Sequence, residues 1–264
     1  MDRIYTEHYA DSNARAVDDW IEEGWRWGIP VTREEYDEAK HGRWSLLLTP
    51  TKPVPEDWYP PLEGCRVLGL AAGGGQQGPI LTARGARCTI LDYSPKQLET
   101  ERMVARREGY EIETVRADMS RTLPFEDNAF DLIFHPVSNC YILNVDHLWR
   151  ECFRVLRPGG VLLAGLDNGF NYLFDEVDGD EALRVTHGLP FNPLKDRELY
   201  KKSVENNWGI QFSHTLEEQI GGQLKAGFTL TDVYEDYNGV GRLHELHVPT
   251  FWATRSVKPA DLGR

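Results

Sequence analysis

Cysteine is scarce in this 264-residue sequence, and none of its four cysteines (Cys65, Cys88, Cys140 and Cys152) belongs to a Cys-x-x-Cys pair. This scattered spacing argues against a disulfide framework and a zinc site, so we expect reduced, mostly buried thiols and no bound metal. Long apolar runs are missing too, since none approaches the roughly 20 residues needed to cross a bilayer. The first residues also lack the basic and apolar regions of a secretory signal. We therefore expect a cytoplasmic protein without a membrane contact.

Basic residues are in the minority, with 29 Lys and Arg against 42 Asp and Glu, which gives a formal net charge of −13. Because a surface of this charge repels phosphate groups, nucleic acid is not an expected partner. The hydrophobic fraction of 41% and the mean hydropathy of −0.50 are typical of a globular chain rather than of a disordered one. We expect a small-molecule partner, and composition does not determine the oligomeric state.

The sequence divides into two expected parts. Residues 1–63 hold five of the eight tryptophans and end in a proline-rich stretch, which favours extended chain and predicts an N-terminal cap or lid. Residues 64–264 form the expected main domain, interrupted by an irregular insertion at 168–212. A connection of that length without clear periodicity is unusual unless it has a function.

Short apolar runs alternate with helical patterns in the first half of this domain. Five runs indicate strands, at residues 65–70, 88–92, 114–116, 130–134 and 161–165. Ser94 and Pro95 are typical of a helix start, and Gly109 of its end. A further helix is indicated by the apolar face of Leu148, Cys152 and Val155. Strands and helices in this alternation predict βαβ units, and hence a parallel sheet covered on both faces.

The C-terminal region extends the same plan. Thr215 and Glu218 form a capping-box pattern, and Leu216, Ile220 and Leu224 predict the apolar stripe of one helix. Two strand-like runs follow, at residues 228–234 and 251–255, and an antiparallel pair at one edge of the sheet accommodates them. The predicted fold is therefore α/β, a Rossmann-like, doubly wound, mostly parallel seven-stranded sheet with an antiparallel edge strand and an aromatic-rich N-terminal cap.

A glycine-rich loop follows the first predicted strand, from Ala71 to Gly78. In an open parallel sheet ligands bind at the carboxyl ends of the strands, where residues this small let a ligand approach the backbone. The N–H groups at the start of the next helix favour an anionic group there. Asp92 and Asp118 end the second and third strands, placed to accept from ribose hydroxyls and from an adenine amine. A tight turn is the alternative for the loop alone, but the two acids favour a nucleoside-bearing cofactor.

Two cofactor classes fit this loop. Residues 73–78 match the G-x-G-x-x-G pattern with Asp92 downstream, which indicates a dinucleotide and an NAD(P)-dependent oxidoreductase. The second acid, Asp118, and the Arg-Val-Leu-Arg-Pro-Gly-Gly run at 154–160 favour the other class. With these motifs the chain resembles the class I S-adenosylmethionine-dependent methyltransferases, closely over residues 64–167 and in outline over 213–256.

The resemblance implies a set of site residues. A loop around the methionine part of S-adenosylmethionine is implied for Ala71, Ala72, Gly73, Gly75 and Gln77. Asp92 is implied at the ribose with Tyr93 against the adenine, and Asp118 at the adenine amine with Met119 beside it. The segment 135–141 is implied to line the reaction site. There His135 is the candidate general base and cofactor contact, and Asn139 and Tyr141 are candidates to orient an acceptor; plain strand-end and loop structure is the alternative for all three.

Aromatic residues of the N-terminal part offer a further hypothesis. Trp25, Trp27 and Trp44 are expected either to close over the cofactor or acceptor, since ring faces attract cations, or to pack as an ordinary cap. The insertion 168–212 is expected to shape the acceptor pocket.

The sequence departs from the family at two positions. Gly69 stands where the first strand usually carries an acid, and Ala71 stands at the first loop glycine. Another residue, from the tryptophan-rich N-terminus or Gln76 or Gln77, is expected to replace that acid. The predicted function is in-line methyl transfer from S-adenosylmethionine to a small molecule, and the alternatives are the NAD(P)-dependent oxidoreductase and a non-catalytic S-adenosylmethionine-binding protein.

Overall fold

The structure is a computed structural model that describes residues 3–174 and 183–260, so residues 175–182 of the predicted insertion lie outside it. A seven-stranded sheet has the order β3-β2-β1-β4-β5-β7-β6. Its strands are β1 Arg66–Leu70, β2 Arg87–Asp92, β3 Glu113–Arg116, β4 Phe130–His135, β5 Leu156–Asp167, β6 Thr229–Asp236 and β7 Phe251–Val257. The helices are α1 Arg3–Glu22, α2 Arg33–Lys40, α3 Gln77–Ala83, α4 Pro95–Glu108, α5 Val145–Val155, α6 Arg197–Glu205, α7 Gly222–Ala226 and α8 Gly241–Glu245.

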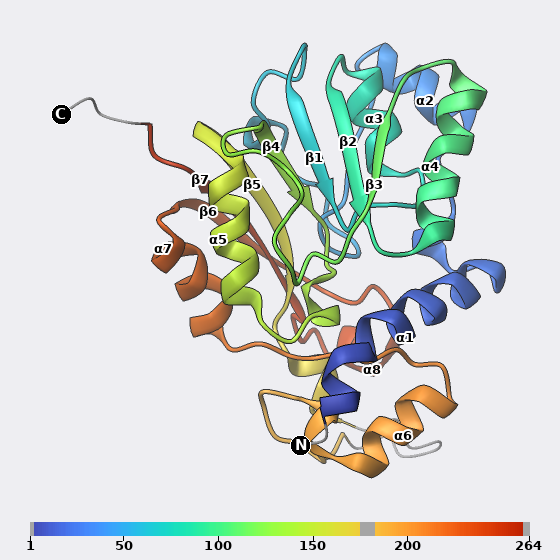
Figure 1. Ribbon diagram of the computed structural model, residues 1–264, viewed down its shortest axis with the longest axis vertical. Helices are drawn as coiled ribbons and strands as arrows, with labels where there is room; N and C mark the ends of the chain where they lie inside the picture. Colours follow the sequence, from blue (N-terminus) through green and yellow to red (C-terminus); the bar gives the residue numbers. More distant parts are fainter. Residues whose placement is uncertain (1–2, 175–182, 261–264) are drawn as a thin grey trace.

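The strand pairing confirms the predicted doubly wound sheet. Strands β1 to β5 pair in parallel, with the order reversing between β1 and β4. Strand β7 runs antiparallel to β5 and to β6, and β6 lies at the edge. Helices α3 and α4 lie on one side of the sheet and α5 and α7 on the other, while α1 and α6 lie across its lower end (Figure 1).

Alternating side chains of each strand form the two layers of the core. In β1, Val67 belongs to the cluster under α3, and Leu68 belongs to the cluster under α5. On α5, Leu148, Cys152 and Val155 are all 0% exposed, which confirms the predicted apolar face. Because both faces of the sheet are covered, its strands are apolar on both sides.

Helix α4 begins and ends where the sequence predicts. The hydroxyl of Ser94 accepts a hydrogen bond from the N–H of Gln97 at 3.0 Å, and Pro95 occupies the first turn. Gly109 ends the helix in the left-handed conformation, with φ at +76°. This places the N-terminal turn of α4 beside the loop after β1, where the backbone N–H of Gly74 donates to the carbonyl of Gln97 at 3.1 Å.

The predicted apolar stripe before β6 holds only at Ile220, which packs against the cluster under α5. Leu216 and Leu224 are 60% and 50% exposed, whereas Gln219 and Gln223 are buried. A π-helical stretch at Glu217–Gly221 precedes α7 and rotates the residues that follow it, Leu224 included, relative to an unbroken α-helix, whereas Leu216 lies ahead of that stretch. The buried amides find partners in the sheet: Gln219 Nε2 donates to the carbonyl of Asp167 at 2.6 Å, and Gln223 Oε1 accepts from Ser256 Oγ at 2.7 Å.

The N-terminal segment joins the sheet in two ways. Its later part, including Leu48 and Trp58, is buried in the same cluster as β1 and β4, continuous with the main core. Its first part, α1, is held at the carboxyl end of the sheet by polar contacts, among them Asp18 Oδ1 with Ser94 Oγ at 2.5 Å. In the described part of the chain, no helix has the length and apolar character needed to span a membrane.

Candidate active site

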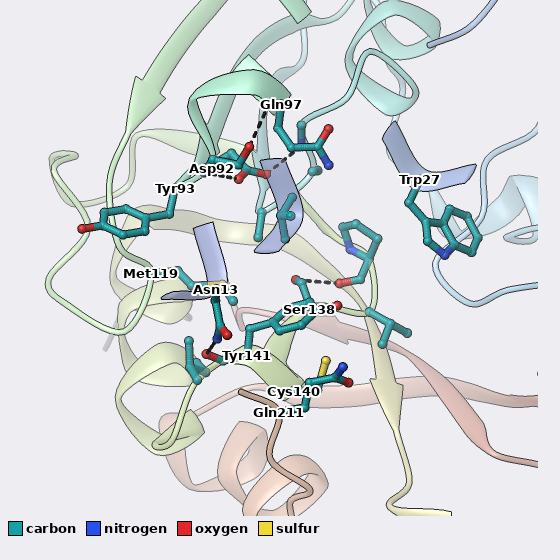
Figure 2. Close-up of a pocket in the computed structure, with 18 of the residues that line it drawn as sticks. Asn13, Trp27, Asp92, Tyr93, Gln97, Met119, Ser138, Cys140, Tyr141 and Gln211 are labelled. Atoms are coloured by element: carbon teal, nitrogen blue, oxygen red, sulfur yellow. Dashed lines mark hydrogen bonds between the residues drawn. The ribbon is translucent and has the colours of Figure 1, made fainter. Parts of the chain in front are cut away.

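A cavity of about 340 Å³ lies at the carboxyl end of the sheet, covered by α1 and the loop that follows it. Figure 2 shows Asp92 and Gln97 at one end of it and Cys140 and Gln211 at the other, with Tyr141 between. The first end contains the glycine-rich loop and the ends of β2 and β3. The second contains the end of β5 and parts of the insertion, so one cavity joins the two regions expected for cofactor and acceptor.

Both predicted acids line this cavity. Asp92 Oδ2 accepts from the N–H of Gly73 at 3.1 Å, and Oδ1 accepts from the N–H of Ser94 at 2.9 Å. Burial raises the pKa of Asp92 to about 6, and these two N–H donors oppose the rise. Asp118 Oδ1 accepts from the N–H of Ser120 at 2.8 Å. Each carboxylate keeps lone pairs for a ligand.

The glycine N–H groups of the loop are already bonded within the protein. Each of residues 73–75 donates its N–H to another segment. The acceptors, in order, are Asp92 Oδ2 at 3.1 Å, the carbonyl of Gln97 at 3.1 Å and Glu101 Oε1 at 2.7 Å. These three loop N–H groups are therefore not available to an anion, and the expected anion preference is left to the N–H groups at the start of α3.

The chain after α1 fastens the other side of the loop. Gln76 Nε2 donates to the carbonyls of Arg26 and Ile29, each at 2.8 Å, and the N–H of Val31 donates to the carbonyl of Gly75 at 2.9 Å. The loop is thus held between the N-terminal segment and α4. This rigid arrangement suits a site that fixes a ligand in one orientation.

The structure shows the surroundings of both departures from the family pattern. A Cβ on Gly69 would lie 2.5 Å from Ile90 Cδ1, so a side chain where the family's acid usually stands would require Ile90 to shift. Ala71 adopts a left-handed conformation with φ at +49°, one that glycine adopts without strain. Glu101 of α4, fully buried, bonds the loop from beneath, and burial raises the pKa of its carboxyl to about 8. Gln76, one of the residues expected to replace the acid, holds the loop from the other side through the carbonyls of Arg26 and Ile29.

Most of the predicted cofactor residues meet in the cavity, and some do not. Those that line it are Ala71, Ala72, Gly73, Gln77, Asp92, Tyr93, Asp118 and Met119, together with Tyr141, Trp25 and Trp27. Those that do not are Gly75, His135, Asn139 and Trp44. Gly75 belongs to the loop but faces Glu101 of α4 rather than the cavity. Trp44 packs on Tyr59 with ring centroids 4.9 Å apart, which agrees with the alternative of an ordinary packed cap. The guanidinium of Arg26 lies 4.2 Å from the centre of the Trp27 ring.

The position of His135 contradicts its expected role as a general base. The side chain is 0% exposed, and its Nδ1 lies 2.9 Å from the carbonyl of Leu70. A carbonyl only accepts, so Nδ1 carries the proton, and the buried Nε2 has no partner within the described residues. Burial lowers the pKa of His135 to about 4. Its ring packs on Trp149 instead of facing the cavity.

Asn139 is likewise a structural residue. It is 1% exposed, and its Nδ2 donates to Gln219 Oε1 at 2.8 Å. Gln219 in turn holds the carbonyl of Asp167, so Asn139 ties the loop after β4 to the end of β5.

Sequence reasoning missed three side chains of the site. Asp167 ends β5 as Asp92 ends β2, and this strand-end position was the available signal. Glu101 falls on the buried face of α4 with Leu98 and Ala105, where a charged residue is unusual. Gln97 is the third residue of α4, and nothing in the sequence except its place in the N-terminal cap indicated that it belongs to the site.

Comparison with known proteins agrees with this geometry. Residues 68–164 match the family profile described as "Methyltransferase domain". The chain is 44% identical over 249 residues to the uncharacterized methyltransferase YbaJ of Bacillus subtilis (strain 168), covering 93% of this chain and 97% of the relative. It is 30% identical over 191 residues to a demethylmenaquinone methyltransferase of Mycolicibacterium paratuberculosis (strain ATCC BAA-968 / K-10), covering 70% and 77%.

The fold also matches solved structures. An S-adenosylmethionine-dependent methyltransferase from Mesorhizobium loti has a TM-score of 0.60 at 21% identity, over 76% of this chain and 94% of that one.

Proposed function

The chain belongs to the class I S-adenosylmethionine-dependent methyltransferases, and on that premise we propose that it methylates a small molecule held in the cavity at the carboxyl end of its sheet. The observation that carries this proposal is the continuity of one cavity from the glycine loop to the end of β5 (Figure 2). A volume of about 340 Å³ lies in the range of small-ligand sites. The demethylmenaquinone methyltransferase among the relatives is named for a small-molecule acceptor.

The residues at the loop end fit the cofactor. A Cβ on Gly73 would lie 2.6 Å from Gln97 Cβ and 2.9 Å from Asp92 Oδ2, so only glycine leaves this surface open. Gln97 lines the cavity, and its buried amide oxygen has no partner among the described residues. We assign Asp92 to the ribose hydroxyls and Asp118 to the adenine amine, with Tyr93 and Met119 beside the ring.

The bonded glycine N–H groups argue against the dinucleotide alternative. A dinucleotide fingerprint uses the loop backbone and the following helix N-terminus to bind a pyrophosphate. Here the N–H groups of residues 73–75 have protein acceptors, and one of these is the carboxylate of Asp92. A neutral nucleoside linked to an amino acid places no phosphate against that carboxylate.

S-adenosylmethionine supplies a methyl group on a sulfonium, whose departure as a thioether requires no proton. The work of the protein is therefore alignment of the acceptor and exclusion of water, which together lower barriers by about 7–11 kcal/mol in well-oriented cases. The glycine loop, held by hydrogen bonds to α4 and to the N-terminal segment, fixes the S-adenosylmethionine. The end of β5 and the insertion hold the methyl acceptor. Helix α1 covers both, tied down by the hydroxyl of Tyr93 on Asp11 Oδ1 at 2.7 Å.

Calorimetry tests the cofactor assignment. We expect S-adenosylhomocysteine to bind the wild-type protein and NADH not to bind. Asp92→Ala should weaken S-adenosylhomocysteine binding by about tenfold or more, since it removes charge-assisted hydrogen bonds. Asp57→Asn, at an exposed position outside the cavity, is the matched control. Binding of NADH, or equal binding by Asp92→Ala and wild type, contradicts the assignment.

A screen for S-adenosylhomocysteine release across a metabolite library tests the small-molecule acceptor.

We place the protein in the cytoplasm, since its four cysteines are free and buried, as in reducing compartments.

A further inference from the structure

A buried carboxylate stands at the end of the cavity away from the glycine loop. Asp167, the last residue of β5, is 6% exposed and lines the cavity. Its Oδ1 accepts from the N–H of Gly169 at 2.6 Å, and its Oδ2 accepts from Asn171 Nδ2 at 2.8 Å. One donor on each oxygen leaves lone pairs unused, and no cation forms an ion pair with this carboxylate among the described residues.

A chain of hydrogen bonds fixes the orientation of this carboxylate. Asn171 Oδ1 accepts from Asn238 Nδ2 at 2.8 Å, and Asn238 Oδ1 accepts from the hydroxyl of Thr250 at 2.9 Å. Thr250, 0% exposed, is itself anchored through its N–H to the carbonyl of Asp236 at 3.0 Å. Because each member is held by the next, the Asp167 side chain is preorganised rather than mobile.

Aromatic hydroxyls surround the same end. The hydroxyl of Tyr172 donates to Gln211 Oε1 at 2.9 Å. Tyr141 also lines the cavity, and its hydroxyl has no hydrogen-bond partner among the described residues. Burial raises the pKa of the Tyr141 and Tyr172 hydroxyls well above the ordinary value. The negative charge of nearby groups, including Asp167, adds to this rise as a smaller cause. Tyr141 is therefore a neutral hydrogen-bond donor beside a carboxylate acceptor.

We propose that Asp167 and Tyr141 bind the methyl acceptor, and that the methylated atom is a nitrogen or oxygen that carries hydrogen. This inference rests on the proposed function. An acidic acceptor-binding group in a closed, aromatic site selects ligands that present N–H or O–H, because an unpaired buried carboxylate is costly and a donor satisfies it. A carboxylate-bearing acceptor is disfavoured by repulsion.

The same contact gives Asp167 a part in the transfer. The heteroatom of the acceptor forms the bond to the methyl carbon, the carbon–sulfur bond breaks with its electron pair staying on sulfur, and the acceptor's proton passes to Asp167. Positioned general bases of this kind contribute about 10²–10⁴-fold. Burial raises the pKa of the Asp167 carboxyl to about 6, so it is ionised at neutral pH and more basic than an exposed aspartate. The other titratable groups facing it are Cys140, Tyr141 and Tyr172, and burial raises the pKa of each.

Binding of defined probes tests the inference without knowledge of the natural acceptor. The protein saturated with S-adenosylhomocysteine is titrated with phenethylamine, 4-ethylphenol, 4-ethylanisole and 3-phenylpropionate, and affinity is measured by ligand-observed NMR. We expect phenethylamine or 4-ethylphenol to bind. The affinities of 4-ethylanisole and 3-phenylpropionate should be lower by about tenfold or more. The stronger of the first two shows whether the site prefers an ammonium or a hydroxyl donor.

Variants then locate the contact. Asp167→Asn should lower the affinity for the probe by about tenfold and leave the affinity for S-adenosylhomocysteine within about twofold of wild type. Asp57→Asn is the matched control. Tyr141→Phe removes a hydroxyl that has no partner to lose, so it remains informative if Asp167→Asn does not fold. With any acceptor that turns over, the rate should rise with pH near the pKa of Asp167 in wild type and lose that limb in Asp167→Asn.

Three results overturn the inference: equal probe binding by wild type and both variants, binding of 4-ethylanisole as tight as that of 4-ethylphenol, or no binding by either donor probe. Failure of wild type to bind S-adenosylhomocysteine instead contradicts the proposed function itself.

Discussion

The carboxylate of Glu101 lies directly beneath the glycine loop, where its Oε1 accepts the N–H of Gly75 at 2.7 Å. Its Oε2 is buried without a partner among the described residues and would be 2.7 Å from a Cβ built on Gly78. A side chain at Gly69, where the family's acid usually stands, would require Ile90 to shift. A residue of α4 thus supports the glycine loop, from a position beside Gly75 and Gly78 rather than from the first strand.

Glu101→Gln should remove a pH dependence of stability. Burial raises the pKa of Glu101 from 4.5 to about 8, so the folded state disfavours its ionised form. The contribution of Glu101 to the free energy of unfolding is fully present below pH 4.5. It is lost as pH rises toward 8, by at most about 1.4 kcal/mol per pH unit. The glutamine amide still accepts the N–H of Gly75. Urea unfolding at pH 6 and pH 8 should show wild type losing stability relative to the variant, and parallel losses would contradict the burial argument.

His135→Phe should cost stability without changing the pH dependence of methyl transfer at neutral pH. Loss of the Nδ1 donor leaves the carbonyl of Leu70 unpaired, at a cost of about 1–3 kcal/mol. Because burial lowers the pKa of His135 from 6.5 to about 4, wild type should also lose stability as pH falls through that range, and the variant should not. Chemical unfolding at pH 4.5 and 7 measures both effects. Loss of the rise in rate with pH in the variant would restore His135 as the base.

Ala71→Gly should stabilise the protein by about 0.5–1 kcal/mol. Ala71 holds φ at +49°, a conformation that costs an L-residue about 1–2 kcal/mol, of which the added backbone freedom of glycine offsets part. Thermal unfolding measures the change. Ala72→Gly, at the neighbouring position without a positive φ, is the matched control and should destabilise.

Gln97→Leu should separate binding from stability. Its amide oxygen has no partner within residues 3–174 and 183–260, so its removal should not lower the free energy of unfolding. S-adenosylhomocysteine should bind about tenfold more weakly, since a ligand donor loses its acceptor. Calorimetry and urea unfolding check the two parts, with exposed Glu99→Gln on the same helix as control. Unchanged affinity would place the cofactor elsewhere in the cavity.

Local pattern was sufficient for most of the architecture. Strand β2 and helix α4 follow from an apolar run, the cap at Ser94 and the left-handed Gly109, all signals within a few residues of one another. The π-helical stretch before α7 was beyond such reasoning. There Gln219 and Gln223 are buried with hydrogen bonds to distant β-strand residues, while Leu216 and Leu224 are exposed.

The amino-acid sequence alone determined the seven strands and the helices α4 and α5, but not α1, α2, α6 or α8. It also determined the small-residue loop and the acids Asp92 and Asp118, because strand ends in a parallel sheet meet at one edge. Only the tertiary structure decided which side chains face the cavity. It buried His135 against the carbonyl of Leu70 and brought Asp167 to the cavity. Burial and hydrogen-bond partners depend on residues far apart in the chain, and these set both the charge state and the accessibility of each group.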